Sequence, residues 1–138
     1  MPVVTGIRET CLYCEDLAAT RAFYTGLFKF PVLGEDASRF CALDAAGVSV
    51  LLLFKKGSTL DTMHAPEGII PPHDGDGPVH IGFSIPSAEY DLWKDELSRR
   101  SIPIVSETTW RLGGRSIYFH DPDGHLVELL TPGIWPNF

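Results

Sequence analysis

The chain has 138 residues, 44% of them hydrophobic, which suits one ordinary domain with a buried core. A formal net charge of −7, with scattered basic residues, argues against a nucleic acid or an anionic membrane surface as partner. No apolar run approaches the roughly 20 residues of a membrane-spanning helix and the first residues lack a secretory signal pattern, so we expect a cytoplasmic protein.

The first half of the chain predicts a strand, a helix and further strands. Residues 7–14 favour a strand, and Asp16 is a suitable N-cap for a helix over residues 17–28. Short strands at 39–43 and 48–54 follow, joined by the turn sequence Asp44-Ala-Ala-Gly47. Apolar residues at helical spacing predict the buried side of the helix, namely Ala19, Ala22, Phe23 and Leu27.

Two of the three cysteines, Cys11 and Cys14, form a C-x-x-C pattern, which elsewhere binds zinc or carries a redox disulfide. On a strand, residues i and i+3 point to opposite faces, and this geometry prevents both uses. We therefore expect Cys11, Cys14 and Cys41 to be reduced, packed thiols.

The second half repeats the order of the first. Residues 56–78 lose all periodicity and are rich in glycine and proline, which indicates a long connector. A strand at 80–85 then precedes a helix that runs to about residue 100, with Ser87 as its N-cap. Tyr90, Trp93 and Leu97 share one face of that helix. Three strands complete this half, at 102–107, 115–120 and 126–130.

The two halves therefore look like one β-α-β-β-β unit written twice. In this overlay His80 corresponds to Glu9, and Glu128 corresponds to Leu51. Glu128 and Leu51 each lie four residues after the glycine of a turn. Side-chain alternation along the strands places Glu9, Cys11 and Tyr13 on one face, and His80, Gly82 and Ser84 on one face. The other histidines, His64, His73, His120 and His125, lie in or beside turns and are expected at the surface.

Three stretches together resemble the vicinal oxygen chelate superfamily, which includes glyoxalase I, fosfomycin-resistance proteins, extradiol dioxygenases, methylmalonyl-CoA epimerase and bleomycin-binding proteins. The stretches are Asp16-Leu-x5-Phe23-Tyr24, His80-Ile-Gly-Phe, and the segment from Gly114 through Asp121-Pro-Asp-Gly to Glu128-Leu. The resemblance implies an α+β, glyoxalase-like fold in which two βαβββ modules form a half-barrel cavity. It implies one domain over residues 1–138, with modules at about 5–55 and 79–133, usually within a homodimer.

Carried over by position, the resemblance implies Glu9, His80 and Glu128 as ligands of a divalent metal such as Mn, Ni, Zn or Fe(II), with Leu51 unable to be a fourth. Two carboxylates and an imidazole suit such an ion. A carboxylate at Glu128, in an otherwise apolar strand, is costly unless it is paired with a cation or hydrogen-bonded. Tyr118 is the candidate catalytic residue, and the candidate substrate contacts are Cys11, Tyr13, Ser116, Arg115 and Trp110.

The leading hypothesis is a small metal-dependent lyase, isomerase or transferase of the glyoxalase and fosfomycin-resistance type, acting on a small oxygen-rich molecule. A metal would stabilise the oxyanion that develops on such a substrate. The alternative is a metal-free protein that binds a drug or metabolite, as bleomycin-binding relatives do. The missing fourth ligand at Leu51 favours this alternative, whereas the carboxylate of Glu128 argues against it.

Overall fold

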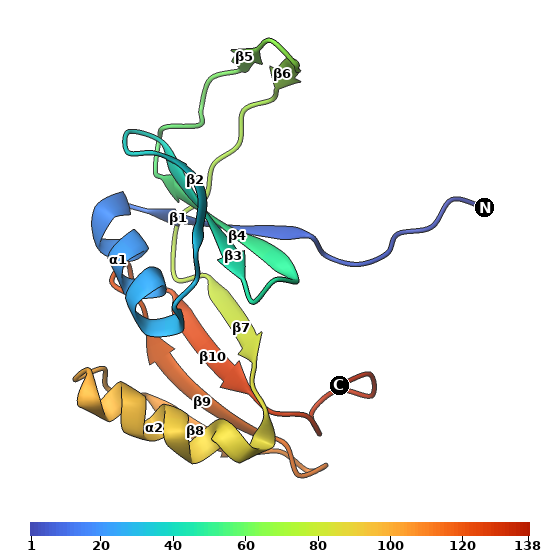
Figure 1. Cartoon of the computed structure of the whole chain (residues 1–138), viewed down its shortest axis with the longest axis vertical. Coiled ribbons are helices and arrows are strands. Elements are labelled where there is room, and N and C mark those ends of the chain that lie inside the picture. Colours follow the sequence, from blue (N-terminus) through green and yellow to red (C-terminus); the bar gives the residue numbers. More distant parts are fainter. The chain divides into compact units, whose positions relative to one another are not determined.

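Two four-stranded sheets, each with one α-helix, make up most of the computed structural model, which describes residues 1–138 (Figure 1). The chain divides into two units, Met1–Asp76 and Gly77–Phe138, and the division falls within the predicted connector. Each unit has the βαβββ order, so the predicted α+β class with paired modules is confirmed. No helix is long and apolar enough to cross a membrane.

The first unit has the strand order β1-β4-β3-β2. Strand β1 (Glu9–Cys14) pairs parallel with β4 (Ser49–Lys55), and the other pairs, with β3 (Phe40–Ala45) and β2 (Val32–Asp36), are antiparallel. Strand β2 was not predicted. It lies at the sheet edge, its register shifts between Val32 and Gly34, and three of its five residues are acidic or glycine, so it lacks the apolar alternation of a strand.

Helix α1 (Leu17–Phe28) begins as predicted, because the Asp16 carboxylate accepts a hydrogen bond from the backbone N–H of Ala19 at 3.0 Å. Its buried face was predicted correctly for Leu27, while Phe23 is half-buried and the two alanines were predicted wrongly. The buried side chains are Leu17, Thr20, Tyr24 and Leu27, whereas Ala19 and Ala22 are exposed. The larger side chains of Leu17 and Tyr24 bury more apolar surface than two alanines do, so the helix packs with the face that carries them toward the sheet.

The second unit repeats this arrangement with the order β7-β10-β9-β8. Strand β7 (His80–Ser84) pairs parallel with β10 (Leu126–Leu130), which pairs antiparallel with β9 (Arg115–His120). Strand β8 (Ser106–Thr109) forms the far edge, shifted from the predicted 102–107, because Pro103 lacks the N–H that a strand needs.

Helix α2 (Tyr90–Arg99) starts later than predicted. Residues Ser87–Glu89 form a 3-10 turn, and Ser87 makes no capping hydrogen bond, so its prediction as the N-cap was wrong. Pro86 fixes the extended backbone before this turn, and the tighter turn takes the place of a side-chain cap. The predicted inner face is confirmed for Tyr90 and Leu97, which are buried, while Trp93 is half-buried.

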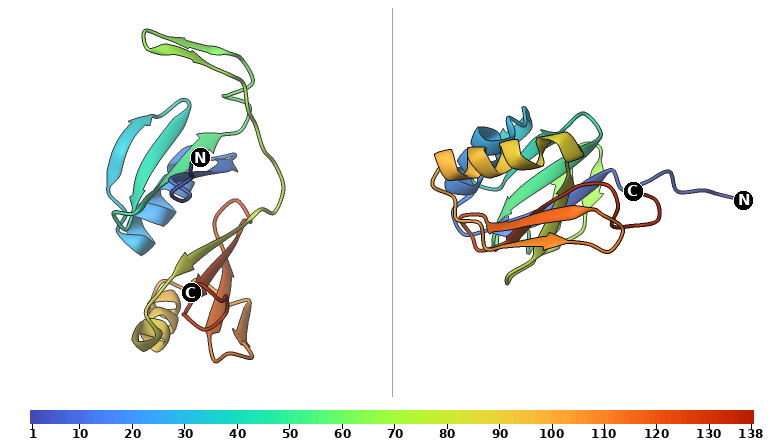
Figure 2. Two further views of the ribbon diagram at one scale, coloured as in Figure 1. Left: turned by 90° about the vertical axis from the view of Figure 1, so that its right-hand side faces the viewer. Right: turned by 90° about the horizontal axis from the view of Figure 1, so that it is seen from below.

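The connector is more ordered than its composition predicts. It contains a hairpin of β5 (Met63–Ala65) and β6 (Gly68–Ile70), which extends away from the sheet of the first unit (Figure 2). The stretch after the hairpin returns to that sheet, where His73 exchanges hydrogen bonds with Thr59. A hydrogen bond of 2.6 Å between the Tyr13 hydroxyl and His73 Nδ1 joins it to β1.

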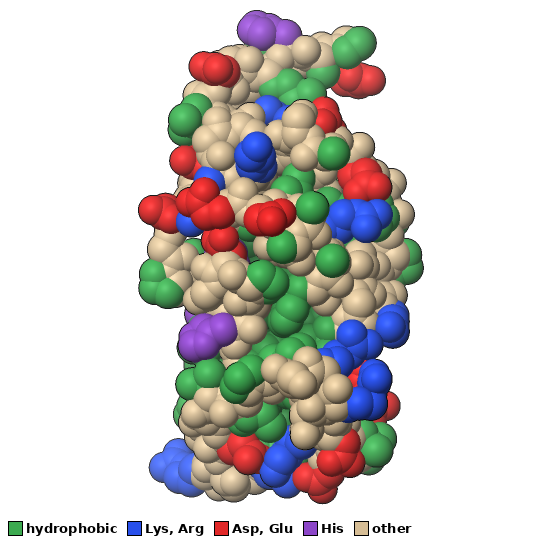
Figure 3. All heavy atoms as spheres, turned by 90° about the vertical axis from the view of Figure 1, so that its left-hand side faces the viewer, with side chains coloured by type: hydrophobic (Ala, Val, Ile, Leu, Met, Phe, Trp, Pro, Cys, Tyr) green, Lys and Arg blue, Asp and Glu red, His purple; other side chains and the backbone are tan.

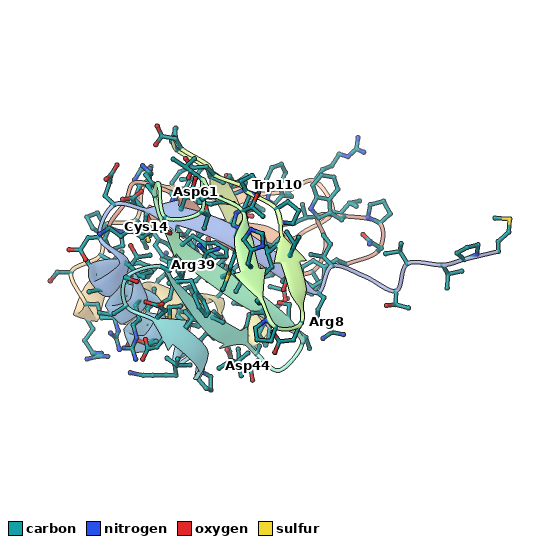
Figure 4. All side chains as sticks on the ribbon, turned by 90° about the horizontal axis from the view of Figure 1, so that it is seen from above. Arg8, Cys14, Arg39, Asp44, Asp61 and Trp110 are labelled. Carbon is teal, nitrogen blue, oxygen red and sulfur yellow. The ribbon has the colours of Figure 1, made fainter.

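Charged side chains of both signs lie interspersed on the face of the molecule shown in Figure 3. Several form exposed pairs, such as Arg21 with Glu35 and Arg99 with Glu96. Arg8 instead donates to the carbonyl oxygen of Val48 at 2.8 Å, beside the β3–β4 turn that contains Asp44 (Figure 4). That turn is closed by the predicted residues, since the Gly47 N–H donates to the Asp44 carboxylate at 2.6 Å.

The Tyr13–His73 hydrogen bond should stabilise the return of the connector. Tyr13→Phe removes the hydroxyl but keeps the ring, which stacks on Phe54 and also contacts Gly75. We expect a loss of about 1 kcal/mol in the free energy of unfolding and faster proteolysis between residues 56 and 76. Urea unfolding and limited proteolysis measure these effects. His73→Ala in the Tyr13→Phe background should then add little through this hydrogen bond, and full additivity of the two substitutions would contradict the coupling.

Candidate functional site

The sheet of the second unit has one apolar and one polar face. On β9 and β10, Ile117, Phe119, Val127 and Leu129 are fully buried and alternate with the side chains of Ser116, Tyr118 and Glu128. Because successive strand residues point to opposite faces, these three polar side chains share the face that also carries His80 of β7. The candidate site is this polar face.

Glu128 is the centre of the site, and its side chain is only 10% exposed. Its Oε1 accepts two hydrogen bonds from β9, from the Ser116 hydroxyl at 2.5 Å and from the Tyr118 hydroxyl at 3.0 Å. Its Oε2 lies 3.1 Å from Nε2 of His80. The two oxygens therefore have different surroundings: the neighbouring strand holds Oε1, and Oε2 faces the imidazole.

The orientation of His80 is set by its other nitrogen. Nδ1 lies 3.0 Å from the backbone carbonyl oxygen of Leu126, which can only accept, so Nδ1 carries the proton and donates it. In a neutral imidazole with that tautomer, Nε2 is a lone pair directed at a carboxylate oxygen. Two acceptors at this distance need a positive charge between them, supplied by a proton on Nε2 or by a metal ion.

The pair fits a divalent metal. Two ligands that each lie about 2.1 Å from an ion are roughly 3 Å apart when they are adjacent in its coordination sphere, which matches the 3.1 Å between Nε2 and Oε2. A histidine ligand whose second nitrogen donates to a backbone carbonyl is a common metal-site arrangement. Gly82, the partner of Glu128 in the β7–β10 register, places no side chain beside the carboxylate.

Tyr118 contacts Glu128 directly, and its ring is tilted over His80 at a centroid separation of 6.2 Å. Burial, followed by the hydrogen bond to Glu128, raises the pKa of the Tyr118 hydroxyl. The hydroxyl is therefore protonated at neutral pH and can act as a hydrogen-bond or proton donor. Its role as the catalytic residue stays a prediction.

Arg115 and Trp110 are placed differently from each other. Arg115 lies on the helix side of β9, with its guanidinium carbon 3.7 Å from the centroid of the Tyr90 ring. Burial and a hydrogen bond to Glu107 raise the pKa of Tyr90 to about 12, so this ring stays a neutral phenol beneath the cation. Trp110 instead donates from its indole Nε1 to the Ser116 hydroxyl at 2.8 Å, so it joins the polar face.

In the first unit, the predicted alternation of β1 agrees with the burial of its side chains. Leu12 and Cys14 are buried, and Glu9, Cys11 and Tyr13 lie on the other face of the strand. The thiol of Cys14, which is labelled in Figure 4, donates to the Phe54 carbonyl at 3.3 Å. Neither unit by itself gathers three His, Cys, Asp or Glu side chains at metal-binding spacing.

The position that matches Glu128 in the first unit is Leu52, not Leu51. Glu9 pairs with Val50 and His80 pairs with Leu126, so two residues further along, Leu52 corresponds to Glu128. Leu51 is fully buried and corresponds to Val127. The overlay was one residue out because it aligned the turn glycines, Gly47 and Gly124, and not the strand pairing. Strands β4 and β10 each begin two residues after their glycine, but the register of β4 with β1 is shifted by one residue from that of β10 with β7. The replacement is still leucine, which cannot bind a metal.

His125 was predicted at the surface, and this prediction was wrong. Its side chain is buried, with Nδ1 2.7 Å from the Asp121 carboxylate, which also accepts from the backbone N–H groups of Asp123 and His125. These bonds close the β9–β10 turn three residues before Glu128. The sequence does contain a signal for this burial, because Asp121, four residues earlier, can pair with the imidazole and so offset the cost of burying it.

Comparisons with known proteins agree with this fold. A family model described as Glyoxalase/Bleomycin resistance protein/Dioxygenase superfamily matches residues 6–129. The metallothiol transferase FosB of Bacillus licheniformis is 27% identical over 135 residues, covering 96% of this chain and 79% of FosB. A solved structure described as lactoylglutathione lyase from Agrobacterium tumefaciens has 30% identity and a TM-score of 0.88, covering 96% of this chain and 98% of that one. The fosfomycin resistance protein FosX from Listeria monocytogenes has 25% identity and a TM-score of 0.68, with 94% of each chain covered.

The thiol of Cys11 should react slowly despite its partial exposure. Burial, followed by the negative charge of Glu9, raises its pKa, so less of it is thiolate at neutral pH. We expect alkylation at pH 7.5 to be slower than that of a small free thiol and to accelerate as the pH rises. Glu9→Gln should accelerate it by removing the nearby charge. Mass spectrometry with peptide mapping separates Cys11 from Cys14 and Cys41, and a rate at pH 7.5 equal to that of glutathione would contradict the prediction.

Proposed function

The chain belongs to the glyoxalase/bleomycin resistance protein/dioxygenase superfamily, and on this premise we propose that it is a divalent-metal-dependent enzyme acting on a small, oxygen-rich substrate. The observation that carries the proposal is the 3.1 Å distance between His80 Nε2 and Glu128 Oε2, in an imidazole whose Nδ1 faces a backbone carbonyl. The Leu126 carbonyl lies 3.0 Å from Nδ1 of the imidazole and two hydroxyls donate to the carboxylate, so these contacts orient both side chains.

His80 and Glu128 would hold the metal, and Glu9 of β1 is the proposed third ligand. A divalent ion bound there supplies Lewis acidity, which stabilises negative charge as it develops on a substrate oxygen. Three protein ligands are enough for a catalytic ion, since such ions keep positions open for water or substrate. The metal could be Mn, Ni, Zn or Fe(II).

The residues around the pair would orient the carboxylate and handle protons. Ser116 and Tyr118 hold Oε1, so Glu128 cannot rotate away from His80 without losing two hydrogen bonds. Tyr118 stays the proposed catalytic residue; its one O–H donates to Glu128, so to donate to a substrate oxygen it would exchange that hydrogen bond for one to the substrate. Cys11 and Tyr13 stay proposed substrate contacts, although Tyr13 already has His73 as a partner. Arg115 packs on Tyr90, so we leave it out of the proposed site.

The related proteins suggest which reactions to test. They are described as a metallothiol transferase, a fosfomycin resistance protein and a lactoylglutathione lyase. We therefore propose a lyase, isomerase or transferase, and the first substrates to screen are glutathione adducts, epoxides and acyl-CoA thioesters. The homodimer and the cytoplasmic location expected from the sequence belong to the same proposal.

Substitution of either member of the pair should abolish metal binding. We expect His80→Ala and Glu128→Gln to weaken Mn²⁺ binding by at least about 100-fold, more than the loss of a residue outside the coordination sphere. The purified protein without a histidine tag is stripped of metal and titrated by calorimetry, with elemental analysis before stripping.

His120→Ala and Glu67→Gln are the matched controls, because both side chains are exposed and lie outside the pair. Wild-type affinity in both pair variants would sink the metal proposal. If the wild-type protein takes up no metal and, after treatment with a chelator, binds an aromatic or cationic ligand tightly, the alternative of a metal-free binding protein is favoured instead.

Glu9→Gln tests the third ligand separately. If Glu9 binds the metal, the neutral amide should reduce Mn²⁺ affinity by about 10-fold or more while the fold stays intact, because the Glu9 side chain is exposed in its own unit. Glu15→Gln, another exposed acidic residue close in sequence, controls for the loss of one charge. Equal affinity in the two variants would remove Glu9 from the ligand set and leave His80 and Glu128 in it.

A further inference from the structure

We propose that Trp110 is a positioning residue, which acts through Ser116 to fix the Glu128 carboxylate for metal binding. This inference rests on the proposed function and gives Trp110 a role different from substrate contact. It follows from a continuous chain of hydrogen bonds between the β8–β9 loop and the site.

The direction of the chain is fixed by chemistry. An indole N–H can only donate and a carboxylate can only accept, so the Ser116 hydroxyl between them accepts from Trp110 at 2.8 Å and donates to Glu128 Oε1 at 2.5 Å. Ser116 is fully buried, so no bulk water competes for its hydroxyl. A hydroxyl that accepts one hydrogen bond becomes a better donor in the next, and the indole therefore strengthens the hold on Glu128.

The loop that carries Trp110 is anchored at both ends. The backbone N–H of Trp110 donates to the Gly114 carbonyl at 2.7 Å, and the Trp110 carbonyl accepts from the N–H of Gly113 at 2.9 Å. Gly114 in turn donates to Gly133 at 3.1 Å, and the two backbones approach so closely that a Cβ on Gly114 would lie 2.7 Å from the Gly133 carbonyl carbon. The close approach of Gly114 and Gly133 thus fixes the path of the loop. The indole is held in place before any metal or substrate arrives.

The hydrogen bonds from Trp110 through Ser116 hold one oxygen of the Glu128 carboxylate and leave the other facing His80. Trp110 and Ser116 act on Oε1, together with Tyr118, whereas Oε2 faces His80. Rotation of the carboxylate would exchange the two oxygens and break this division. Removing the indole donor should therefore loosen the carboxylate and lower metal affinity without removing a ligand.

The test measures metal affinity without substrate, so that a substrate contact cannot contribute. Trp110→Phe removes the N–H and keeps an aromatic ring, Ser116→Ala removes the hydroxyl, and Ser116→Thr keeps it. We expect about 10-fold weaker Mn²⁺ binding in Trp110→Phe, at least as large a loss in Ser116→Ala, and recovery toward wild type in Ser116→Thr. The Trp110→Phe/Ser116→Ala double variant should match Ser116→Ala alone, because the indole acts through that hydroxyl.

Trp135→Phe is the matched control, since the Trp135 side chain is exposed, and it should bind Mn²⁺ like wild type. The visible spectrum of the Co²⁺-loaded protein provides a second readout and should change in Trp110→Phe, because the carboxylate orientation changes. Thermal unfolding of each variant identifies a general loss of fold. Wild-type Mn²⁺ affinity in Trp110→Phe, or additive losses in the double variant, would overturn the inference.

A measurement on metal-free protein separates this inference from the proposed function. The NMR resonance of the Trp110 indole N–H should shift in Ser116→Ala and also in Glu128→Gln, because both substitutions alter the same hydrogen-bonded chain. If wild-type protein takes up no metal and the resonance shifts, the proposed function fails but the chain of contacts stands. If the resonance stays in place in both variants, the inference fails whatever the metal titration gives.

Discussion

The second unit depends on a single constraint, a carboxylate placed within a strand whose neighbours are apolar. Val127 and Leu129 are fully buried, and Glu128 between them is 7% exposed. A carboxylate removed from water without partners costs several kcal/mol, so a strand of this kind persists only if nearby groups compensate the charge. Ser116 and Tyr118 supply two hydrogen-bond donors, and a proton or a metal ion between His80 and Glu128 supplies the rest. The position of one acidic side chain thus determines which residue types its neighbours on two adjacent strands can have.

The pleat of the sheet keeps this polar network apart from the core. On β9, Ser116 and Tyr118 turn toward Glu128, while Ile117 and Phe119 turn toward the buried side. Arg115 belongs to that second side through its contact with Tyr90 of α2. Alternate residues of the same strand therefore serve either binding chemistry or packing. This separation explains how a small sheet can hold a charged site without losing the apolar contacts that stabilise it.

The features that follow from regular periodicity were predictable from the sequence. The doubled βαβββ order, the faces of β1 and the place of His80 beside Glu128 all follow from strand alternation and the order of elements. Features that depend on a shift of one residue or on the path of a loop were not. The buried face of α1 and the match of Glu128 with Leu52 each differ from expectation by one residue, because side-chain size and strand register decide them. The contact of Trp110 with Ser116 depends on a loop whose path a glycine pair fixes, and no spacing in the sequence reports that path.

A comparison of the two sheets shows that the carboxylate and its donors occur together. Leu52 takes the place of Glu128 in the first unit, and by the strand registers Ala42 takes the place of Tyr118 and Phe40 that of Ser116. Where the acid is absent, both hydroxyl donors are absent too. A buried hydroxyl such as that of Ser116 costs free energy without an acceptor, just as a buried carboxylate does without a donor, so the acid and its donors stabilise each other.

The first unit keeps only Glu9, at the position that matches His80, and that side chain is exposed at the start of β1, where water can solvate it. It therefore needs no fixed donors. The same backbone thus accommodates an apolar surface with one solvated acid in one copy and a buried acid held by two hydroxyl donors in the other. The second arrangement requires several residues to be of the right type at once. In it, the Glu128 oxygen that accepts from no hydroxyl is Oε2, which faces His80. A cation bound at that oxygen would compensate the free-energy cost of burying the Glu128 carboxylate.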